Sequence, residues 1–203
     1  MEDRPAKRLA ATVVTVDAWE GLLDEIQRMD WASYAMWPST EWYVPSRVPK
    51  AFAALRRVHS HRGSRAAYQQ FMDALAHNHE GWVYAAAAPG ADLLARTARI
   101  LEGWARITSL EVLIDLTCFA ADASFRSPRG DLVRLATAIR DAAAPLRPDL
   151  ERWRAARPDQ VPAGPGWCSP EPDNHRAFRD VASSAAVLLE TLQDNDEALL
   201  PEM

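Results

Sequence analysis

The sequence has few of the features that mark a secreted, membrane-spanning or disulfide-stapled protein. Only two cysteines occur in 203 residues, Cys118 and Cys168, and they form no CxxC spacing, so we expect two reduced thiols. No run of about 18 uncharged apolar residues is present. The start, MEDRPAKRLA, lacks the apolar segment and the small-residue cleavage site of a secretory signal. These absences predict a cytoplasmic protein.

Strand signals and catalytic signatures are also scarce. ATVVTV, residues 11 to 16, is the single short β-branched run, and it leads directly into a helix start. The chain has no glycine-rich phosphate loop, no GxSxG elbow and no cysteine and histidine pairing of recognisable spacing. We therefore predict an all-α protein that is not an enzyme and that uses no cofactor.

The residues that are present describe a series of short helices. Apolar residues make up 48% of the chain and charged residues 25%, which is the balance of a soluble globular domain. The apolar spacing indicates helices over residues 18–29, 47–58 and 64–76, and another over 83–101 that is interrupted at Pro89 and Gly90. Further helices are expected to start at 108 and at 132, the second with Leu132 on its apolar face. Pro145 and Pro148 interrupt this last helical pattern, which resumes at 150.

Polar residues before these helices are candidate N-caps. Asp17, Ser46 and Ser64 precede three of the predicted helices, and Thr108 or Ser109 precedes a fourth. Gly63 lies in the turn before Ser64, where we expect it to supply left-handed backbone geometry.

Short amphipathic helices in consecutive hairpins, several with proline near the second or third turn, predict a particular architecture. We expect a short HEAT-like α-solenoid of antiparallel helical hairpins, with about three repeats and a C-terminal capping helix. A four-helix bundle would need longer unbroken helices. The single domain, residues 1–203, divides into a leader helix and aromatic loop (1–45), helical hairpins (46–160), a proline- and glycine-rich connector (161–173) and the capping helix (174–195).

Charge is unevenly distributed along the chain. The net charge is -5, yet no acidic residue occurs between Trp42 and Met72, where six basic residues lie. This stretch is either a solvated helix face or a surface that recognises a charged partner. An α-solenoid that binds nucleic acid is one alternative function, although the acidic total charge argues against it. The six basic residues are Arg47, Lys50, Arg56, Arg57, Arg62 and Arg65.

Two His-x-His pairs raise the possibility of a metal site. His59 and His61 precede one predicted helix, and His77 and His79 follow it. At about 1.5 Å per residue that helix separates the pairs by roughly 20 Å, so one metal ion cannot bind both. A metal-dependent hydrolase that uses His77, His79 and Glu80 is the second alternative function. The contiguous letters HNH do not match the HNH nucleases, whose three residues are far apart.

Eight tryptophans in 203 residues are unusually many. Trp19, Trp104 and Trp153 have the helical spacing of core residues. The large aromatics in loops either plug helix ends or form a recognition surface. Successive turns of a solenoid can line one edge, so the two loop groups can form one aromatic surface edged by acids. The predicted partner-binding residues are Trp37, Glu41, Trp42, Tyr43, Glu80 and Trp82.

Two segments, WYVPSRVPKAFAALR and LAHNHEGWVYAAAAPGADLLARTARILEGWARI, resemble a bacterial group of small HEAT-repeat-like proteins. In that group an aromatic loop leads into a Val-Pro helix start, and a His-x-Gly turn precedes a tyrosine, small residues and a proline. The resemblance covers residues 31 to 140, and the C-terminal third departs from it. The matching positions are Val48-Pro49, His79-Glu80-Gly81, Tyr84 and Pro89.

The resemblance implies a structural role for the HNHEGW segment and a function for the chain. It implies that Gly81 supplies the turn and that His79 caps or packs on it. Members of such groups are similar to immunity proteins, which neutralise a toxin encoded beside them. We therefore expect a protein-binding module whose partner is a cognate toxin and whose action is to occlude the toxin's active site.

Overall fold

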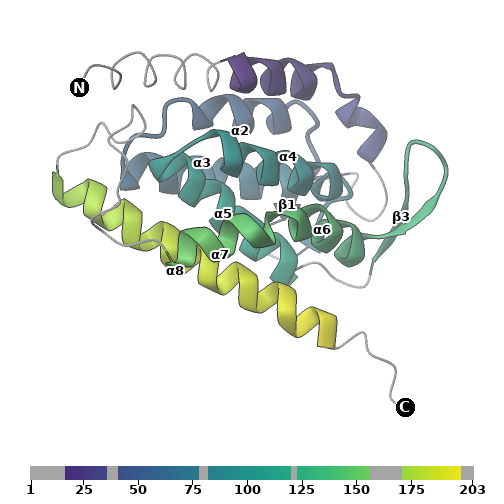
Figure 1. Cartoon of the computed structure of the whole chain (residues 1–203). Helices are drawn as coiled ribbons and strands as arrows, with labels where there is room; N and C mark the ends of the chain where they lie inside the picture. The colour runs from purple at the N-terminus through teal and green to yellow at the C-terminus, as the bar shows by residue number, and fades with distance from the viewer. Residues whose placement is uncertain (1–16, 36–40, 78–81, 120–122, 156–170, 198–203) are drawn as a thin grey trace.

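The computed structural model describes residues 17–35, 41–77, 82–119, 123–155 and 171–197, and within the last range it describes the side chains of 180–193. Helices dominate these residues, and the strands among them form two small antiparallel pairs, so the prediction of an all-α protein is confirmed (Figure 1). In order, the elements are a helix over residues 17–28, η1 (Trp31–Tyr34), α2 (Arg47–Leu55), α3 (His61–Leu75), β1 (Ala76–His77), β2 (Trp82–Val83), α4 (Ala87–Ile100), α5 (Gly103–Phe119), β3 (Ser124–Arg126), β4 (Leu132–Arg134), α6 (Leu135–Ala143), η2 (Ala144–Leu146), α7 (Arg147–Ala155) and α8 (Glu171–Glu197).

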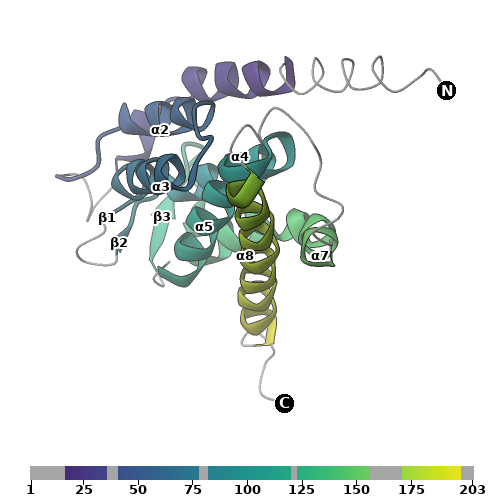
Figure 2. The same ribbon diagram turned by 90° about the vertical axis from the view of Figure 1, so that its left-hand side faces the viewer.

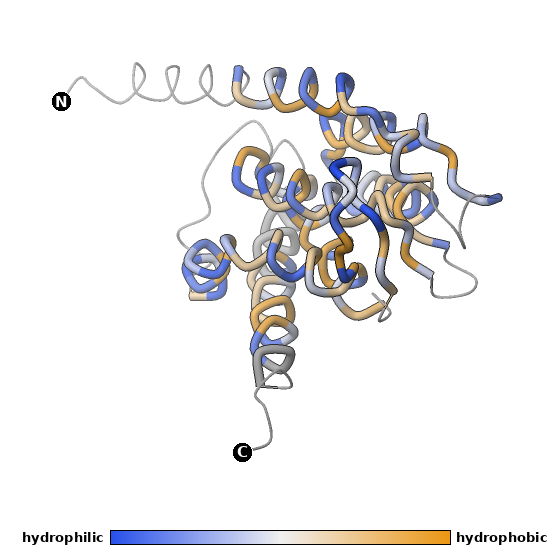
Figure 3. Tube along the Cα trace, turned by 90° about the vertical axis from the view of Figure 1, so that its right-hand side faces the viewer, coloured by the Kyte–Doolittle hydropathy of each residue, from blue (hydrophilic) through white to orange (hydrophobic). Residues whose placement is uncertain are grey.

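The helix of residues 17–28 lies along one side of the molecule and alternates between polar and apolar residues (Figure 3). Its apolar face includes Trp19 and Ile26, which are buried. Two ion pairs hold its polar side: Arg96 contacts both carboxylate oxygens of Glu25 at 2.7 and 2.5 Å, and Arg56 contacts Glu20 at 2.6 Å. These pairs are substantially exposed, so we assign the docking of this helix mainly to apolar burial.

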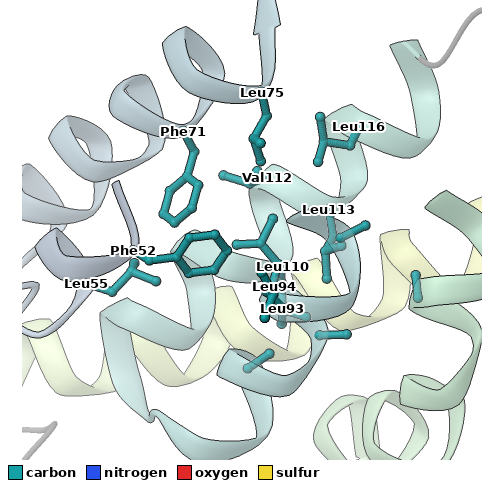
Figure 4. Packing of buried hydrophobic residues seen from close by; sticks show 14 of the residues in the cluster. Phe52, Leu55, Phe71, Leu75, Leu93, Leu94, Leu110, Val112, Leu113 and Leu116 are labelled. Carbon is teal, nitrogen blue, oxygen red and sulfur yellow. The ribbon is translucent and has the colours of Figure 1, made fainter. Parts of the chain in front are cut away.

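The centre of the core lies between α2, α3, α4 and α5 (Figure 4). Phe52 of α2 and Phe71 of α3 meet edge to face with ring centroids 4.9 Å apart. Two contacts in the same order along both helices indicate that α3 and α5 run parallel. The hydroxyls of Ser64 and Thr108 meet at 2.9 Å. Further along each helix, the Tyr68 hydroxyl donates to the Asp115 carboxylate. These two contacts fix the first half of α3 against the middle of α5.

The last helix packs against the helices that precede it. In Figure 2, α8 runs beside α5 with α7 on its other side, and both helices contact it extensively. It begins at Glu171, earlier than the predicted residue 174. Its buried apolar residues are Val181, Ala185, Leu188, Leu189 and Leu192.

Alternate helices also contact each other, α3 with α5 and α4 with α6, which is a property that stacked hairpins require. The arrangement of the hairpins as a HEAT-like solenoid stays a prediction. Among the described helices, none has the length and apolar character needed to cross a lipid bilayer.

The predicted N-caps at Ser64 and at Thr108 or Ser109 were wrong. Helix α3 begins at His61 and is capped by Ser60, whose hydroxyl accepts a hydrogen bond from the Gly63 amide. Gly63 is therefore inside the first turn of α3, and its φ is not positive. The residues that were predicted to be caps lie inside helices. Ser64 is buried in α3, and the hydroxyls of Thr108 and Ser109 donate to carbonyls one turn back in α5. Ser46 precedes α2, but its side chain makes no capping bond.

The predicted interruption of a helix at Pro89 was also wrong. Val83 belongs to β2, and α4 begins only at Ala87, so Pro89 lies in the first turn, where its missing amide is not needed. Gly90 is buried in α4, and a Cβ there would lie 3.0 Å from the methyl groups of Leu75. The glycine allows α3 and α4 to approach closely.

Leu132 was predicted to lie on the apolar face of a helix, but it belongs to β4 and its side chain is 72% exposed. Strand β4 pairs with β3 in the register Ser124↔Arg134, Phe125↔Val133 and Arg126↔Leu132. A Ser-Pro-Arg-Gly turn joins the strands, and turn residues of this kind favour a hairpin over a continued helix. The helical period resumes at Leu135, where α6 begins.

Candidate functional site: an exposed aromatic patch

A chain of aromatic contacts fixes the loop that precedes α2. The indole nitrogen of Trp31 donates to the Ile26 carbonyl at 2.8 Å, and the Tyr43 hydroxyl donates to the Trp31 carbonyl at 2.9 Å. The Tyr43 ring packs against the Tyr84 ring with centroids 5.3 Å apart. Burial raises the pKa of Tyr43 well above its usual value, so the phenol remains a donor at any physiological pH.

Tyr43 was predicted to be a partner-binding residue, and the structure corrects that prediction. Its side chain is only 5% exposed, because the ring fills the space beside Tyr84 and the hydroxyl is needed by the Trp31 carbonyl. The residues on either side of it, Trp42 and Val44, are exposed. Tyr43 therefore anchors the loop, and the anchor leaves its neighbours facing outward.

Trp42 is 58% exposed and rests on the imidazole of His77. The two ring centroids are 5.3 Å apart, and the ring planes are inclined at 54°. His77 is the last residue of β1, which continues directly from the end of α3. The long rigid helix thus places the ring that supports Trp42.

Trp82 is the cross-strand neighbour of the same histidine. In the β1–β2 strand pair His77 is directly opposite Trp82, so their side chains project to the same face with Cβ atoms about 5 Å apart. A backbone hydrogen bond from Tyr84 to Leu75 at 2.9 Å extends the pairing toward α3. Trp82 is 45% exposed. Trp42 and Trp82 are thus both neighbours of His77, and we call these three residues the aromatic patch.

The aromatic patch has the properties of a binding surface. Glu41, beside Trp42, is exposed and adds an acid at the edge. Indole faces carry negative electrostatic potential, so they bind apolar groups, other rings and cations. Trp42 and Trp82 do not plug helix ends, since roughly half of each side chain faces solvent. The three rings offer aromatic contact area to a partner.

The structure brings together some of the predicted site residues and not others. Trp42, Trp82 and Glu41 lie on the surface as expected, Tyr43 is buried, and Trp37 and Glu80 lie outside the described residues. His77 was not predicted to be part of this surface. The signal was present, because a loop of four residues with a glycine, followed by the strand-forming residues Trp-Val-Tyr, is typical of a hairpin.

The metal site of the alternative hydrolase is not tested, because His79 and Glu80 lie outside the described residues. In the part of the chain that the structure describes, no three His, Cys, Asp or Glu side chains gather closely enough to hold a metal ion. His61, from the other pair, packs its ring against Trp104 with centroids 5.4 Å apart. Cys118 is an exposed free thiol.

Part of the acid-free basic stretch has structural contacts. Arg56 pairs with Glu20, Arg65 lies over the Tyr68 ring at 5.5 Å, and Arg47 donates to the Asp73 carbonyl at 3.4 Å. The remaining basic residues of the stretch, Lys50, Arg57 and Arg62, are exposed.

Comparison of the chain with protein-family models, with curated proteins and with solved structures gave no match. The resemblance to HEAT-repeat-like proteins therefore rests on its sequence motifs alone.

Proposed function

We propose that this chain is a protein-binding module, and specifically an immunity protein that neutralises a cognate toxin by occluding its active site. The observation that supports binding is the aromatic patch, in which Trp42 and Trp82 are 58% and 45% exposed and both neighbour His77. The toxin as the partner comes from the resemblance of residues 31 to 140 to immunity-like HEAT-repeat proteins. The aromatic patch is the support for binding, and the resemblance is the support for a toxin as the partner.

Large exposed aromatic groups favour tight association when they are held in place before binding. Tryptophan and tyrosine are enriched among the residues that dominate interface energetics, and truncating such an anchor typically costs about 2 kcal/mol or more. Each Trp of the patch has a rigid support: Tyr43 anchors the loop of Trp42, and the β1–β2 pair holds Trp82. Little side-chain and loop entropy is therefore lost when a partner binds.

The test is co-expression with the product of the adjacent gene in a host that this product harms. The full chain should restore growth, and the purified pair should form a complex by size-exclusion chromatography. Trp42→Ala and Trp82→Ala should each weaken the complex at least about tenfold. Val187→Ala on α8 is the matched control. Val187 is 42% exposed, a fraction similar to the 45% of Trp82, and it lies outside the patch.

Two outcomes separate the parts of the proposal. An adjacent product that is harmless alone, or that stays toxic beside this chain, contradicts the immunity function. A complex that forms normally with both Trp variants, while their circular dichroism and melting temperatures match the parent, supports an immunity protein that binds through another surface.

A further inference from the structure

The β3–β4 hairpin projects from the helical body, as Figure 1 shows at the strand labelled β3. Its turn is held by several bonds that centre on Ser127. The Ser127 amide donates to the Asp131 carbonyl and the Gly130 amide donates to the Ser127 carbonyl, both at 2.8 Å. The Ser127 hydroxyl also accepts from the amides of Arg129 and Asp131 at 3.2 and 3.3 Å.

Glycine at position 130 completes this turn, because its φ of +90° is one that other residues rarely adopt. Arg126 adds a further bond from its guanidinium to the Gly130 carbonyl at 3.0 Å. Arg129 lies between Pro128 and Gly130 and is exposed. The turn is therefore built before any partner arrives, which lowers the entropy lost on binding.

The two faces of the hairpin differ. Phe125 and Val133 are opposite each other and half-buried, and Phe125 packs against the core. The register places Arg126 opposite Leu132 on the other face, where both are exposed. Leu132 is 72% exposed, the largest exposed fraction among the big apolar side chains that the structure describes. Since Leu132 contributes nothing to the core, packing does not account for an apolar residue there.

The hairpin differs in charge from the chain as a whole. Between residues 123 and 134 it carries three arginines, at 126, 129 and 134, and one acid, Asp131, so its formal charge is 3 - 1 = +2. The whole chain has a formal net charge of -5. The carboxylates of an acidic partner are attracted by this positive projection, which favours a docking orientation that brings them to the hairpin.

We infer that the β3–β4 hairpin is a second docking element, which inserts into a cleft of a partner protein. Carboxylates line this cleft, and an apolar contact site lies at its centre. Leu132 makes the apolar contact, and the flanking arginines pair with carboxylates around it. The charge complementarity and the exposed leucine carry this assignment. A nucleic acid fits less well, because three arginines neutralise few phosphates and an exposed leucine gains nothing from a phosphate backbone. This surface is separate from the aromatic patch and goes beyond the proposed function.

The experiment uses the full chain and fluorescein-labelled peptide probes, so it does not depend on any toxin. One decapeptide has a single phenylalanine within nine glutamates, and the other has ten glutamates. Fluorescence anisotropy is measured at about 0.01 M salt, where charges act over about 30 Å. The phenylalanine peptide should bind more tightly than the all-glutamate peptide. Arg129→Ser with Arg134→Ser should weaken both about tenfold, and Leu132→Ser should abolish the preference for phenylalanine.

The matched control is Arg57→Ser with Arg62→Ser, which removes two exposed charges, one from the α2–α3 turn and one from the first turn of α3, and should leave peptide affinity within about twofold. Equal losses in the control and in the hairpin variant would mean general charge attraction and would overturn the inference. A Leu132→Ser protein that keeps the phenylalanine preference overturns it also. Tighter, hairpin-dependent binding of a 20-base-pair DNA duplex would assign the hairpin to nucleic acid instead. Circular dichroism of every variant excludes unfolding.

Discussion

The two strand pairs of this helical protein are built in opposite ways. The β1–β2 pair is two residues long on each side, continues from α3, and places His77 opposite Trp82 and against Trp42. The β3–β4 pair is three residues long on each side, projects from the body, and displays arginines around Leu132. The first is supported from behind by the buried rings of Tyr43 and Tyr84, whereas the second is stabilised mainly by its own turn.

This difference teaches that a surface can be pre-organised by two routes. Burial fixes the aromatic patch, so that its geometry depends on the stability of the whole core. Local hydrogen bonds fix the β3–β4 hairpin, so that its geometry depends on five turn residues, 127–131. Substitutions behind the patch should therefore lower global stability, and substitutions in the hairpin turn should act locally.

The largest effect is expected at Tyr43. Tyr43→Ala removes a buried ring and leaves the Trp31 carbonyl without its donor, so the free energy of unfolding should fall by about 3 kcal/mol. Tyr43→Phe keeps the ring and should cost about 1 kcal/mol. Urea denaturation followed by circular dichroism measures both. Equal losses for the two variants would show that ring packing contributes little and would weaken the contrast between the strand pairs.

A smaller but functional effect is expected at Trp82. Trp82→Ala should accelerate dissociation of the partner at least about tenfold, because desolvated aromatic anchors act mainly on the dissociation rate. Global stability should remain within about 0.5 kcal/mol of the parent, since the side chain is 45% exposed. Surface plasmon resonance with the toxin gives the rates. A loss confined to the association rate would assign Trp82 to the rim of the interface.

Gly130→Ala should act only on the hairpin. Nothing lies within 4 Å of the added Cβ, so the cost is the φ of +90° alone, about 1 kcal/mol. Hydrogen exchange at the Ser127 and Gly130 amides should quicken about fivefold, with no change in global unfolding. Gly21→Ala is the control, because Gly21 also has open space but no positive φ, and it should stabilise its helix. Unchanged exchange in the Gly130 variant would contradict a turn that depends on glycine.

The smallest effect concerns the pH dependence of stability. Burial chiefly raises the pKa of Glu111, with Asp115 and Asp180 adding to the shift and Arg65 opposing it, while Tyr68 donates to Asp115 nearby. The folded state holds this proton more tightly than the unfolded chain, so stability falls as pH rises from about 4.3 through the raised folded pKa. Glu111→Gln should therefore raise the melting temperature at pH 7 and not at pH 4. A gain of equal size at both pH values would contradict the shift.

Helical spacing in the sequence was sufficient to predict most of the helices and the core. Trp19, Trp104 and Trp153 were placed in the core from periodicity, and each is less than 9% exposed. The break at Pro145 and Pro148 was also located, since proline removes the amide that a helix interior needs. These features are determined by residues close together in the sequence.

The errors arose where a contact across the fold decided the outcome. Ser64 has the sequence context of a helix cap, but its hydroxyl is used by Thr108 on another helix. Gly90 has the appearance of a helix breaker, but it is retained in α4 because Leu75 lies against it. At the candidate site, the exposed Trp42 and Trp82 were identified from their loop positions, whereas the burial of Tyr43 depends on Trp31 and Tyr84, which no local pattern connects to it.

The distribution of the tryptophans gives the protein an internal optical probe. Of the six tryptophans that the structure describes, Trp19, Trp31, Trp104 and Trp153 are less than 9% exposed, while Trp42 and Trp82 are 58% and 45% exposed. Acrylamide should therefore quench the emission of the patch and leave most core emission unchanged. A partner that covers the patch should remove this quenching and shift the emission maximum to shorter wavelength, so occupancy can be followed without any added label.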